Sequence, residues 1–273
     1  FVGCSANVPV IPSETTYIPE EASSIHISSD AWEIGKNNPT DTAVIGNPGE
    51  AMAAIAAAVD ISEAERRRRQ SRIPKRRKEM ESFYSDPDLD AGISKSQLAA
   101  TLAEVAPNAI MTNEGNTSKY PLLNNWDLGP EQLNANKNGG LGYTLPATIG
   151  AAVATRECGD ERPIIGVVGD GSYLYYPQAL YSAARYDLEL TVVVPDNRNY
   201  RILKDGMLSI YGGTDADHDY LGMDFDPGVD IVANAESHGV HAEFVERADD
   251  LEVALREAIE LDGPAVVDVA VED

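Results

Sequence analysis

From Ser94 to the end of the chain, short apolar segments alternate with longer helical segments, and this alternation constrains the fold more than any other feature. Two of the apolar segments, PIIGVVG at 163–169 and LTVVV at 190–194, are typical of strands buried on both faces of a parallel sheet. Strands that alternate with helices in this way indicate parallel βαβ units with right-handed crossovers. We therefore predict an α/β protein with a doubly wound, mostly parallel sheet and helices on both faces.

The remaining elements follow from start signals and helical spacing. The segment SKSQ at 94–97 is a capping box and predicts a helix that ends before Pro107. A short strand at 108–112 and a polar loop at 113–120 are expected next. Two helices are expected at 144–158 and 178–187, and the alternation continues through 229–239, 241–246, 250–261 and 264–271.

Composition divides the chain into three parts. Residues 1–60 are interpreted as the tail of a central α/β domain, with a strand around Ile25 and Ile27 and an Ala-rich helix at 49–60. Residues 61–93 form a basic, polar linker or an exposed helix. Residues 94–273 form the main domain.

The charge of the chain is strongly acidic but uneven. Twenty-one Lys and Arg against 45 Asp and Glu give a net charge of −24, which disfavours nucleic-acid and anionic-membrane partners. Nine of the basic residues lie in the run 66–78, which is either a solvated surface or a docking segment for an acidic partner. With only seven Lys, the composition is similar to that of proteins from salt-loving microbes, and high salt would screen its self-repulsion.

The cysteine content and the first residues of the chain indicate the cellular compartment in which the protein works. Cys4 and Cys158 are far apart and form no metal-binding motif, so we expect two free thiols rather than a disulfide. The first residues lack the basic and apolar regions of a secretory signal, and no apolar run approaches the length of a membrane span. We expect a cytoplasmic protein.

Two polar loops follow the two buried strands. Asp170 comes directly after the first strand, and Asn197 lies three residues after the second, 27 positions beyond Asp170. One βαβ crossover accounts for this spacing, so both side chains are expected at the carboxyl edge of the sheet, where open α/β sheets bind ligands. A carboxylate and an amide oxygen are hard donors that suit Mg²⁺ or Ca²⁺.

The residues around Asp170 point to a phosphate group. Gly169 and Gly171 allow a sharp turn and a close approach of backbone N–H groups to an anion. Ser172 adds a hydroxyl at the start of the following helix. By itself GDG is also consistent with a plain strand-to-helix turn. The Asn one crossover away favours a site for a metal and a phosphate.

The stretch GDGSYLYYPQALYSAARYDLELTVVVPDNRNY resembles the thiamine-diphosphate signature of the benzoylformate decarboxylase and acetolactate synthase superfamily. The upstream segment GGLGYTLPATIGAAVA looks closer to the benzoylformate decarboxylase branch. The resemblance covers residues 95–271, the diphosphate-binding domain, and implies the thiamine-diphosphate-binding fold. It weakly extends to the tail of the family's central domain in the first 60 residues.

The resemblance implies a role for each matching residue. Asp170 and Asn197 would bind Mg²⁺ through their side chains and Asn199 through its backbone carbonyl. Gly169, Gly171 and Ser172 would lie at the diphosphate. The further cofactor-binding positions implied by the family pattern are Asn116, Thr117, Gly139, Gly140, Leu141 and Tyr200.

Within this set, the GGLG segment would serve the cofactor's pyrimidine. The Gly139 carbonyl would accept from its 4′-amino group, and Leu141 would hold the two rings bent together, so that the amine can generate the thiazolium ylid. In the family this ylid attacks the keto carbon of a 2-keto acid.

Two departures from the family pattern matter. Asp196 stands where Asn is usual, and its carboxylate would either strengthen cation binding or face solvent. The amino-terminal domain that supplies the family's activating glutamate is not recognisable before Ser94, so that catalytic group is expected outside this chain. Glu114 is in the wrong place for that role and is interpreted as structural.

The function predicted from the resemblance is a thiamine-diphosphate- and Mg²⁺-dependent decarboxylase or carboligase acting on a small 2-keto acid. The chain would be its cofactor-diphosphate-binding half, working as a homodimer or homotetramer or with a subunit that supplies the pyrimidine-binding domain. The alternative is a non-catalytic module with a regulatory or assembly role. A nucleotide enzyme is disfavoured because no Walker motif is present.

Other candidate sites are weaker. The four histidines are dispersed and none is paired at metal-ligand spacing. The acidic segment 214–228 lacks the ligand spacing of a calcium loop and is interpreted as a solvated or lid-like loop.

Overall fold

The computed structural model describes residues 1–4, 18–19, 21–83, 92–129, 131–135 and 140–272. The chain divides into two compact units, Phe1–Arg76 and Arg77–Asp273, and each is described by itself. The sequence-based domain limits at 60 and 94 remain predictions. Within the described residues, none of the helices combines the length and apolarity needed to cross a membrane.

The first unit contains two parallel strands and a helix. β1 (Ile25–Ser28) pairs in parallel with β2 (Thr42–Ile45), and α1 (Pro48–Ala58) follows. Asn47 caps α1 by accepting from the backbone N–H of Gly49 at 2.8 Å. No residue of α1 is buried. The strand and the helix expected in this part of the chain are therefore both present.

The basic run lies on the exposed helix α2, Glu63–Phe83. In its first turns Glu65 forms ion pairs with Arg68 and Arg69, each at 2.8 Å. Such pairs, three and four residues apart on a solvated helix, each stabilise it weakly. Over Glu63–Phe83 the helical interpretation of the segment 61–93 is correct, and residues 84–91 lie outside the described residues.

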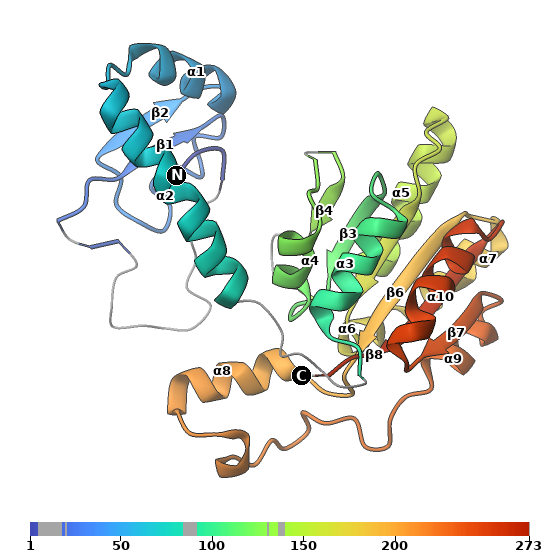
Figure 1. Ribbon diagram of the computed structural model, residues 1–273. Coiled ribbons are helices and arrows are strands. Elements are labelled where there is room, and N and C mark those ends of the chain that lie inside the picture. The colour runs from blue at the N-terminus through green and yellow to red at the C-terminus, as the bar shows by residue number, and fades with distance from the viewer. Residues whose placement is uncertain (5–17, 20, 84–91, 130, 136–139, 273) are drawn as a thin grey trace. The chain divides into compact units, whose positions relative to one another are not determined.

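The second unit contains a parallel sheet of six strands in the order β4-β3-β5-β6-β8-β7 (Figure 1). Every neighbouring pair in this sheet is parallel. The strands are β3 (Ile110–Glu114), β4 (Leu133–Ala135), β5 (Ile164–Val168), β6 (Leu190–Asp196), β7 (His241–Val245) and β8 (Pro264–Ala270).

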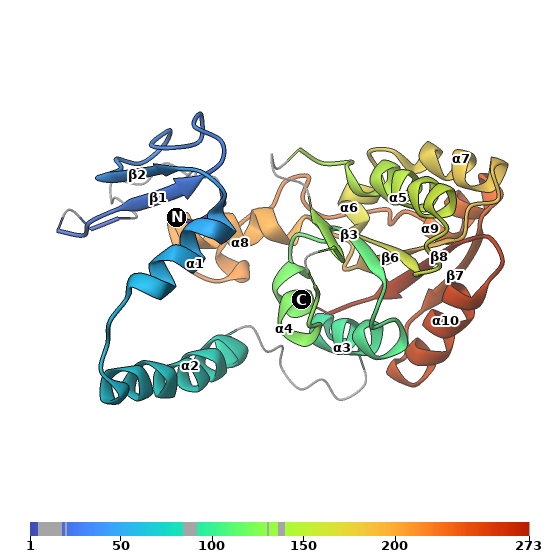
Figure 2. The same cartoon turned by 90° about the horizontal axis from the view of Figure 1, so that it is seen from above.

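Helices cover both faces of this sheet (Figure 2). On one face lie α3 (Lys95–Val105), α4 (Lys119–Asn125) and α10 (Ala248–Glu260). On the other face lie α5 (Thr144–Cys158), α6 (Asp170–Tyr173), α7 (Leu180–Arg185) and α9 (Ile231–Ser237). The predicted doubly wound α/β fold is confirmed.

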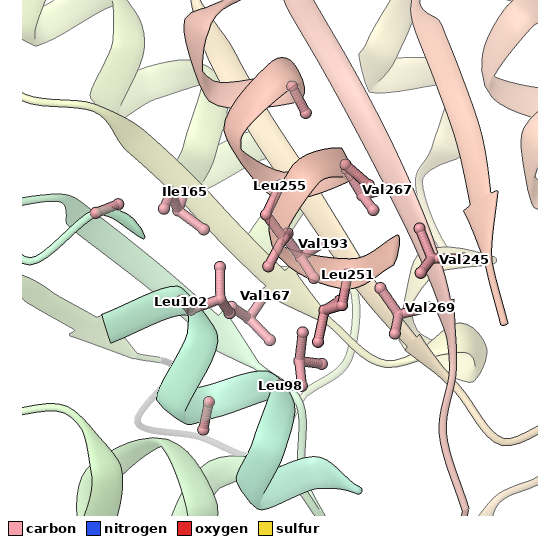
Figure 3. Packing of buried hydrophobic residues seen from close by; sticks show 14 of the residues in the cluster. Leu98, Leu102, Ile165, Val167, Val193, Val245, Leu251, Leu255, Val267 and Val269 are labelled. Atoms are coloured by element: carbon pink, nitrogen blue, oxygen red, sulfur yellow. The ribbon is translucent and has the colours of Figure 1, made fainter. Parts of the chain in front are cut away.

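A core of apolar side chains fills the space between the sheet and each helix layer. Figure 3 shows the first core, in which Leu98, Leu102, Leu251 and Leu255 from the helices pack onto β-branched residues of the strands. The strand residues there include Val167, Val193 and Val267, each wholly buried. Burial of this kind on both faces explains why β5 is apolar and why β6 is apolar over most of its length.

The carboxyl ends of β3 and β5 mark a switch point in the winding of the sheet. From β3 the chain moves outward to β4 through α4, whereas from β5 it moves the other way to β6 through α6 and α7. The two connections lie on opposite faces of the sheet. A crevice between such diverging loops is where open α/β sheets bind ligands.

Some elements differ from the sequence prediction. β3 extends to Glu114, two residues beyond the predicted end, and β6 extends to Asp196. The helices α4 and α8 (Arg201–Tyr211) and the strand β4 were not predicted. The predicted helix at 178–187 is split into the 3₁₀ turn Pro177–Ala179 and α7.

Candidate functional site

The loops after β5 and β6 lie side by side at the carboxyl edge of the sheet. The two strands are parallel neighbours, with Val167 opposite Val193. The β5 loop enters α6 at Asp170, and the β6 loop continues from Asp196 into Asn197. The structure therefore brings together the two loops that the spacing of Asp170 and Asn197 predicted.

Asp170 is buried at this edge, with only 6% of its surface exposed. Its Oδ1 accepts a hydrogen bond from the N–H of Gly171 at 2.7 Å, and its buried Oδ2 has no hydrogen-bond partner. The carboxyl group of Asp196 lies against that of Asp170. Burial, reinforced by this neighbouring carboxyl, raises the pKa of Asp170 to about 8.

The β6 loop is a compact turn held by its own polar groups. Asp196 accepts from the backbone N–H of Arg198 at 2.9 Å, and Arg198 adopts a left-handed conformation with φ of 56°. Asn199 donates through Nδ2 to the backbone carbonyl of Asn197 at 2.7 Å. Asn197 and Asn199 are half-buried, whereas Asp196 is only 7% exposed. Of the two alternatives for Asp196, the solvent-facing one is therefore wrong.

A third buried carboxyl group lies nearby on β8. Asp268 is 4% exposed, and its Oδ1 has no hydrogen-bond partner. Burial, with a further contribution from the charge of Asp196, raises the pKa of Asp268 to about 7. This edge of the sheet therefore concentrates three buried carboxyl groups, and Arg198, whose Nε lies 3.8 Å from Oδ2 of Asp196, compensates only part of their charge.

The donor chemistry of this edge fits a divalent cation. Burying adjacent carboxylates costs free energy unless a positive charge compensates them, and the unpartnered Oδ2 of Asp170 is available to bind one. In the described part of the chain, no group of three or more His, Cys, Asp or Glu side chains is arranged to hold a metal. Beside the carboxylate of Asp170, the β6 loop offers amide and backbone carbonyl oxygens, and a mixed set of oxygen donors of this kind suits Mg²⁺.

Gly171 and Tyr200 connect the two loops. A Cβ atom at Gly171 would overlap the ring of Tyr200, and it would lie 3.2 Å from Cζ of Phe225. The Tyr200 and Phe225 rings stack edge-to-face with centroids 4.8 Å apart. Glycine is therefore required at 171 for the β6 loop to close over α6. Ser172, the next residue, is buried with 6% exposure.

The other predicted cofactor positions lie on two neighbouring segments. Asn116 is exposed and Thr117 half-buried, and both follow β3, whose Glu114 is paired with Val168 at the end of β5. Gly140 is exposed and Leu141 half-buried in the segment before α5. Gly139 lies outside the described residues.

The segment before α5 contacts two other parts of the chain, the residues after α6 and the end of β3. Gly142 has φ of 95°, and a Cβ there would overlap the ring of Tyr176 just after α6. On the other side, Glu114 accepts hydrogen bonds from the N–H groups of Gly142 at 2.6 Å and Thr144 at 2.8 Å. The segments that follow β3, precede α5 and follow β5 are thereby linked.

Sequence reasoning did not assign two of these acidic residues to the site. Asp196 was recognised only as a departure from a family pattern, because the predicted strand ended at 194 and left the burial of Asp196 open. Glu114 was interpreted as structural. Its place within the strand and the two donors it binds 28 and 30 positions away could not be found from local pattern.

The acidic segment 214–228 folds back on the β6 loop. Asp215 pairs with Arg201 at 3.1 Å and accepts from the hydroxyl of Tyr220 at 2.8 Å. The N–H of Tyr200 donates to the carbonyl of Met223 at 2.8 Å. Part of the acidic charge of the segment is thus neutralised by Arg201 of α8, and the lid-like role of the segment stays a prediction.

Comparison with known proteins identifies the family. Residues 120–269, more than half of the chain, match the family described as "Thiamine pyrophosphate enzyme, C-terminal TPP binding domain". The chain belongs to this family. The match includes the loops after β5 and β6 and begins just after Asn116 and Thr117.

Individual thiamine pyrophosphate enzymes resemble the chain over different lengths. The chain is 37% identical to a benzoylformate decarboxylase of Pseudomonas aeruginosa over 131 residues, which are 48% of this chain and 23% of the relative. It is 27% identical to an acetolactate synthase large subunit of Parasynechococcus marenigrum over 261 residues, 94% of this chain and 40% of the relative.

Solved structures of thiamine pyrophosphate enzymes share the fold. The thiamine diphosphate-dependent 4-hydroxybenzoylformate decarboxylase of Rhodococcus jostii RHA1 matches 99% of this chain, with a TM-score of 0.76 and 26% identity. The match covers 48% of that structure. The chain thus spans less than half the length of each of these relatives.

Proposed function

We propose that the chain is the cofactor-diphosphate-binding half of a cytoplasmic thiamine-diphosphate- and Mg²⁺-dependent enzyme that decarboxylates or ligates 2-keto acids. The single observation that carries this proposal is the buried, unpartnered Oδ2 of Asp170 beside Asp196. It occurs at the switch point of a family fold. A divalent cation shared with a diphosphate accounts for this otherwise unfavourable arrangement.

Each residue of the site has a proposed task. Asp170 and Asn197 bind Mg²⁺ through their side chains, and Asn199 binds it through its backbone carbonyl. Residues at the ends of β3 and β5 contact the diphosphate, and Leu141 supports the bent cofactor. When bound, thiamine diphosphate supplies the nucleophilic carbon and the electron sink for the reaction. The proposed diphosphate contacts are Asn116, Thr117, Gly169, Gly171, Ser172 and Tyr200.

The proposed enzyme needs a second half for catalysis. The glutamate that activates the cofactor is expected on a pyrimidine-binding domain, provided by the same polypeptide or by a partner subunit. Because the cofactor would lie between two such domains, we propose a homodimer or homotetramer. The chemistry of the decarboxylase and synthase relatives supports a 2-keto acid as substrate.

Calorimetric titration of the full-length polypeptide with thiamine diphosphate and Mg²⁺ tests the proposal. We expect Asp170→Ala to weaken binding at least about 100-fold, since a charge-assisted contact to the metal is lost. Asp262→Asn is the matched control, because Asp262 is an exposed aspartate at the opposite edge of the sheet, just before β8, and should leave binding unchanged.

The outcomes separate the proposal from its rivals. Absence of binding by the unaltered protein, or equal binding by Asp170→Ala, would contradict the cofactor assignment. Binding without turnover of any 2-keto acid by the complete protein would favour a non-catalytic module instead. Turnover that depends on both thiamine diphosphate and Mg²⁺ would support the enzyme.

A further inference from the structure

Glu114 is a buried carboxylate that joins two distant segments of the second unit. It is the last residue of β3 and is 6% exposed. Its Oε1 accepts from the N–H of Gly142 at 2.6 Å, and its Oε2 accepts from the N–H of Thr144 at 2.8 Å. Both carboxylate oxygens are thus used, and both donors belong to the backbone of the segment that leads into α5.

These two hydrogen bonds give partners to the backbone N–H groups of Gly142 and Thr144, next to a helix start that has no side-chain cap of its own. α5 begins at Thr144, and Tyr143, its N-cap residue, makes no side-chain capping bond. The first N–H groups of a helix have no partner within the helix, and a negative charge there is favourable. Glu114 therefore caps α5 from a neighbouring strand and holds Gly142 in its left-handed conformation.

We infer that Glu114 is a positioning residue that sets the segment 140–144 against the cofactor's pyrimidine end. This inference rests on the proposed function, in which Leu141, directly before Gly142, supports the bent cofactor. Glu114 acts through the backbone of that segment and does not itself touch the reacting atoms. Without its carboxylate, Gly142 and the first turn of α5 lose their common anchor.

The inference predicts a split between the two ends of the cofactor. The diphosphate end is assigned to the loops after β5 and β6 and to Asn116 and Thr117 after β3, and none of these donates either of the two hydrogen bonds that Glu114 accepts. The pyrimidine end is assigned to the segment that Glu114 holds. A change at Glu114 should therefore weaken recognition of the whole cofactor while sparing recognition of its diphosphate alone.

The substitution Glu114→Gln tests this split with minimal change in size. Its amide group can accept from only one of the two N–H groups, and its NH₂ would face the other donor. We would measure the Kd of thiamine diphosphate and the Kd of inorganic pyrophosphate, each with Mg²⁺, on the full-length polypeptide. The expected result is at least about a tenfold weaker Kd for thiamine diphosphate, and a Kd for pyrophosphate within about twofold of the unaltered value.

Glu157→Gln is the matched control, because it makes the same change at an exposed position near the other end of α5. Neither Kd should change in this variant. If Glu114→Gln does not fold, Glu114→Asp keeps the charge but shortens the reach by one methylene, and the same split is expected in smaller measure.

Three outcomes are distinguishable. Unchanged binding of thiamine diphosphate in Glu114→Gln would overturn the inference and leave the proposed function standing. An equal loss for both ligands would show that Glu114 only maintains the fold, and it would also overturn the inference. If the unaltered protein binds neither ligand, the proposed function itself fails.

Discussion

Two aspartates flank the same buried strand, β5, and their environments are opposite. Asp160, before the amino end of β5, forms a bidentate ion pair with Arg162, whose shortest N–O distance is 2.6 Å. Asp170, at the carboxyl end, is buried against another carboxyl group and keeps one oxygen without a partner. The hydrogen bonds from Arg162 lower the pKa of Asp160, whereas burial raises that of Asp170 to about 8.

This difference shows that the surroundings of a carboxylate decide whether its charge is stable in the protein alone. The charge of a half-exposed aspartate that pairs with an arginine is compensated by the protein itself, so no bound cation is needed there. A buried aspartate beside a second carboxyl group is unfavourable in the protein alone, and strongly shifted pKa values of this kind gather at functional sites. Asp160 has Arg162 as its counterion, whereas Asp170 faces another carboxyl group, and this contrast supports the proposed cation site.

The largest effect that we expect from this comparison is a pH dependence of stability that arises from Asp170. A folded-state pKa of about 8, above the ordinary 3.8, means that the folded chain holds a proton that the unfolded chain releases between those values. Without divalent cations, stability should therefore fall as pH rises from 6 to 8.5. Mg²⁺ should restore more stability at pH 8.5 than at pH 6, since it binds the ionised carboxylate. Thermal melts at each pH, with and without Mg²⁺, measure this.

Asp170→Asn provides the control for that pH series. The variant has no proton to release at this position, so its cation-free melting temperature should fall less steeply with pH. Some slope should persist, because the pKa of Asp268 is also raised, to about 7. Equal slopes in the two proteins would show that Asp170 is not the group responsible.

A smaller effect is expected from closing the space at Gly171. Alanine there would push a methyl group into the ring of Tyr200, and overpacking of this kind costs about 1–3 kcal/mol. Urea unfolding should show this loss for Gly171→Ala. Gly169→Ala is the stability control, because a Cβ at Gly169 meets no atom within 4 Å. Equal stability of both variants would mean that Tyr200 does not pack as described.

Much of this fold was predictable because its central strands β5 and β6 are buried on both faces. The apolar runs of β5 and β6 and the capping box of α3 identify their elements directly, and Ser94 does accept from the N–H of Gln97 at 3.0 Å. The missed elements α8 and β4 lack such signals. α8 has Lys204 as its only buried residue, and β4 has three residues at the sheet edge.

The candidate site was predictable where it depends on chain spacing. One crossover separates Asp170 from Asn197, so the topology alone brings their loops together. The roles of Asp196 and Glu114 depend instead on burial and on partners far along the chain. A sequence pattern contains neither, which is why an extra carboxylate and a capping glutamate became interpretable only in the folded structure.

The smallest effect concerns Asp160, and its pH dependence should have the opposite sign to that of Asp170. Because the pKa of Asp160 lies below its ordinary value of 3.8, its contribution to stability is present at neutral pH and is lost progressively as pH falls from 3.8 toward its lowered folded-state pKa. Asp160→Asn should lower the melting temperature by no more than about 2 °C at pH 7, since exposed ion pairs contribute little. The difference in melting temperature between the variant and the unaltered protein should shrink as pH falls from 7 to below 3.8. A difference that grows on acidification would mean that the pair with Arg162 does not hold Asp160 ionised, and the contrast between the two ends of β5 would then fail.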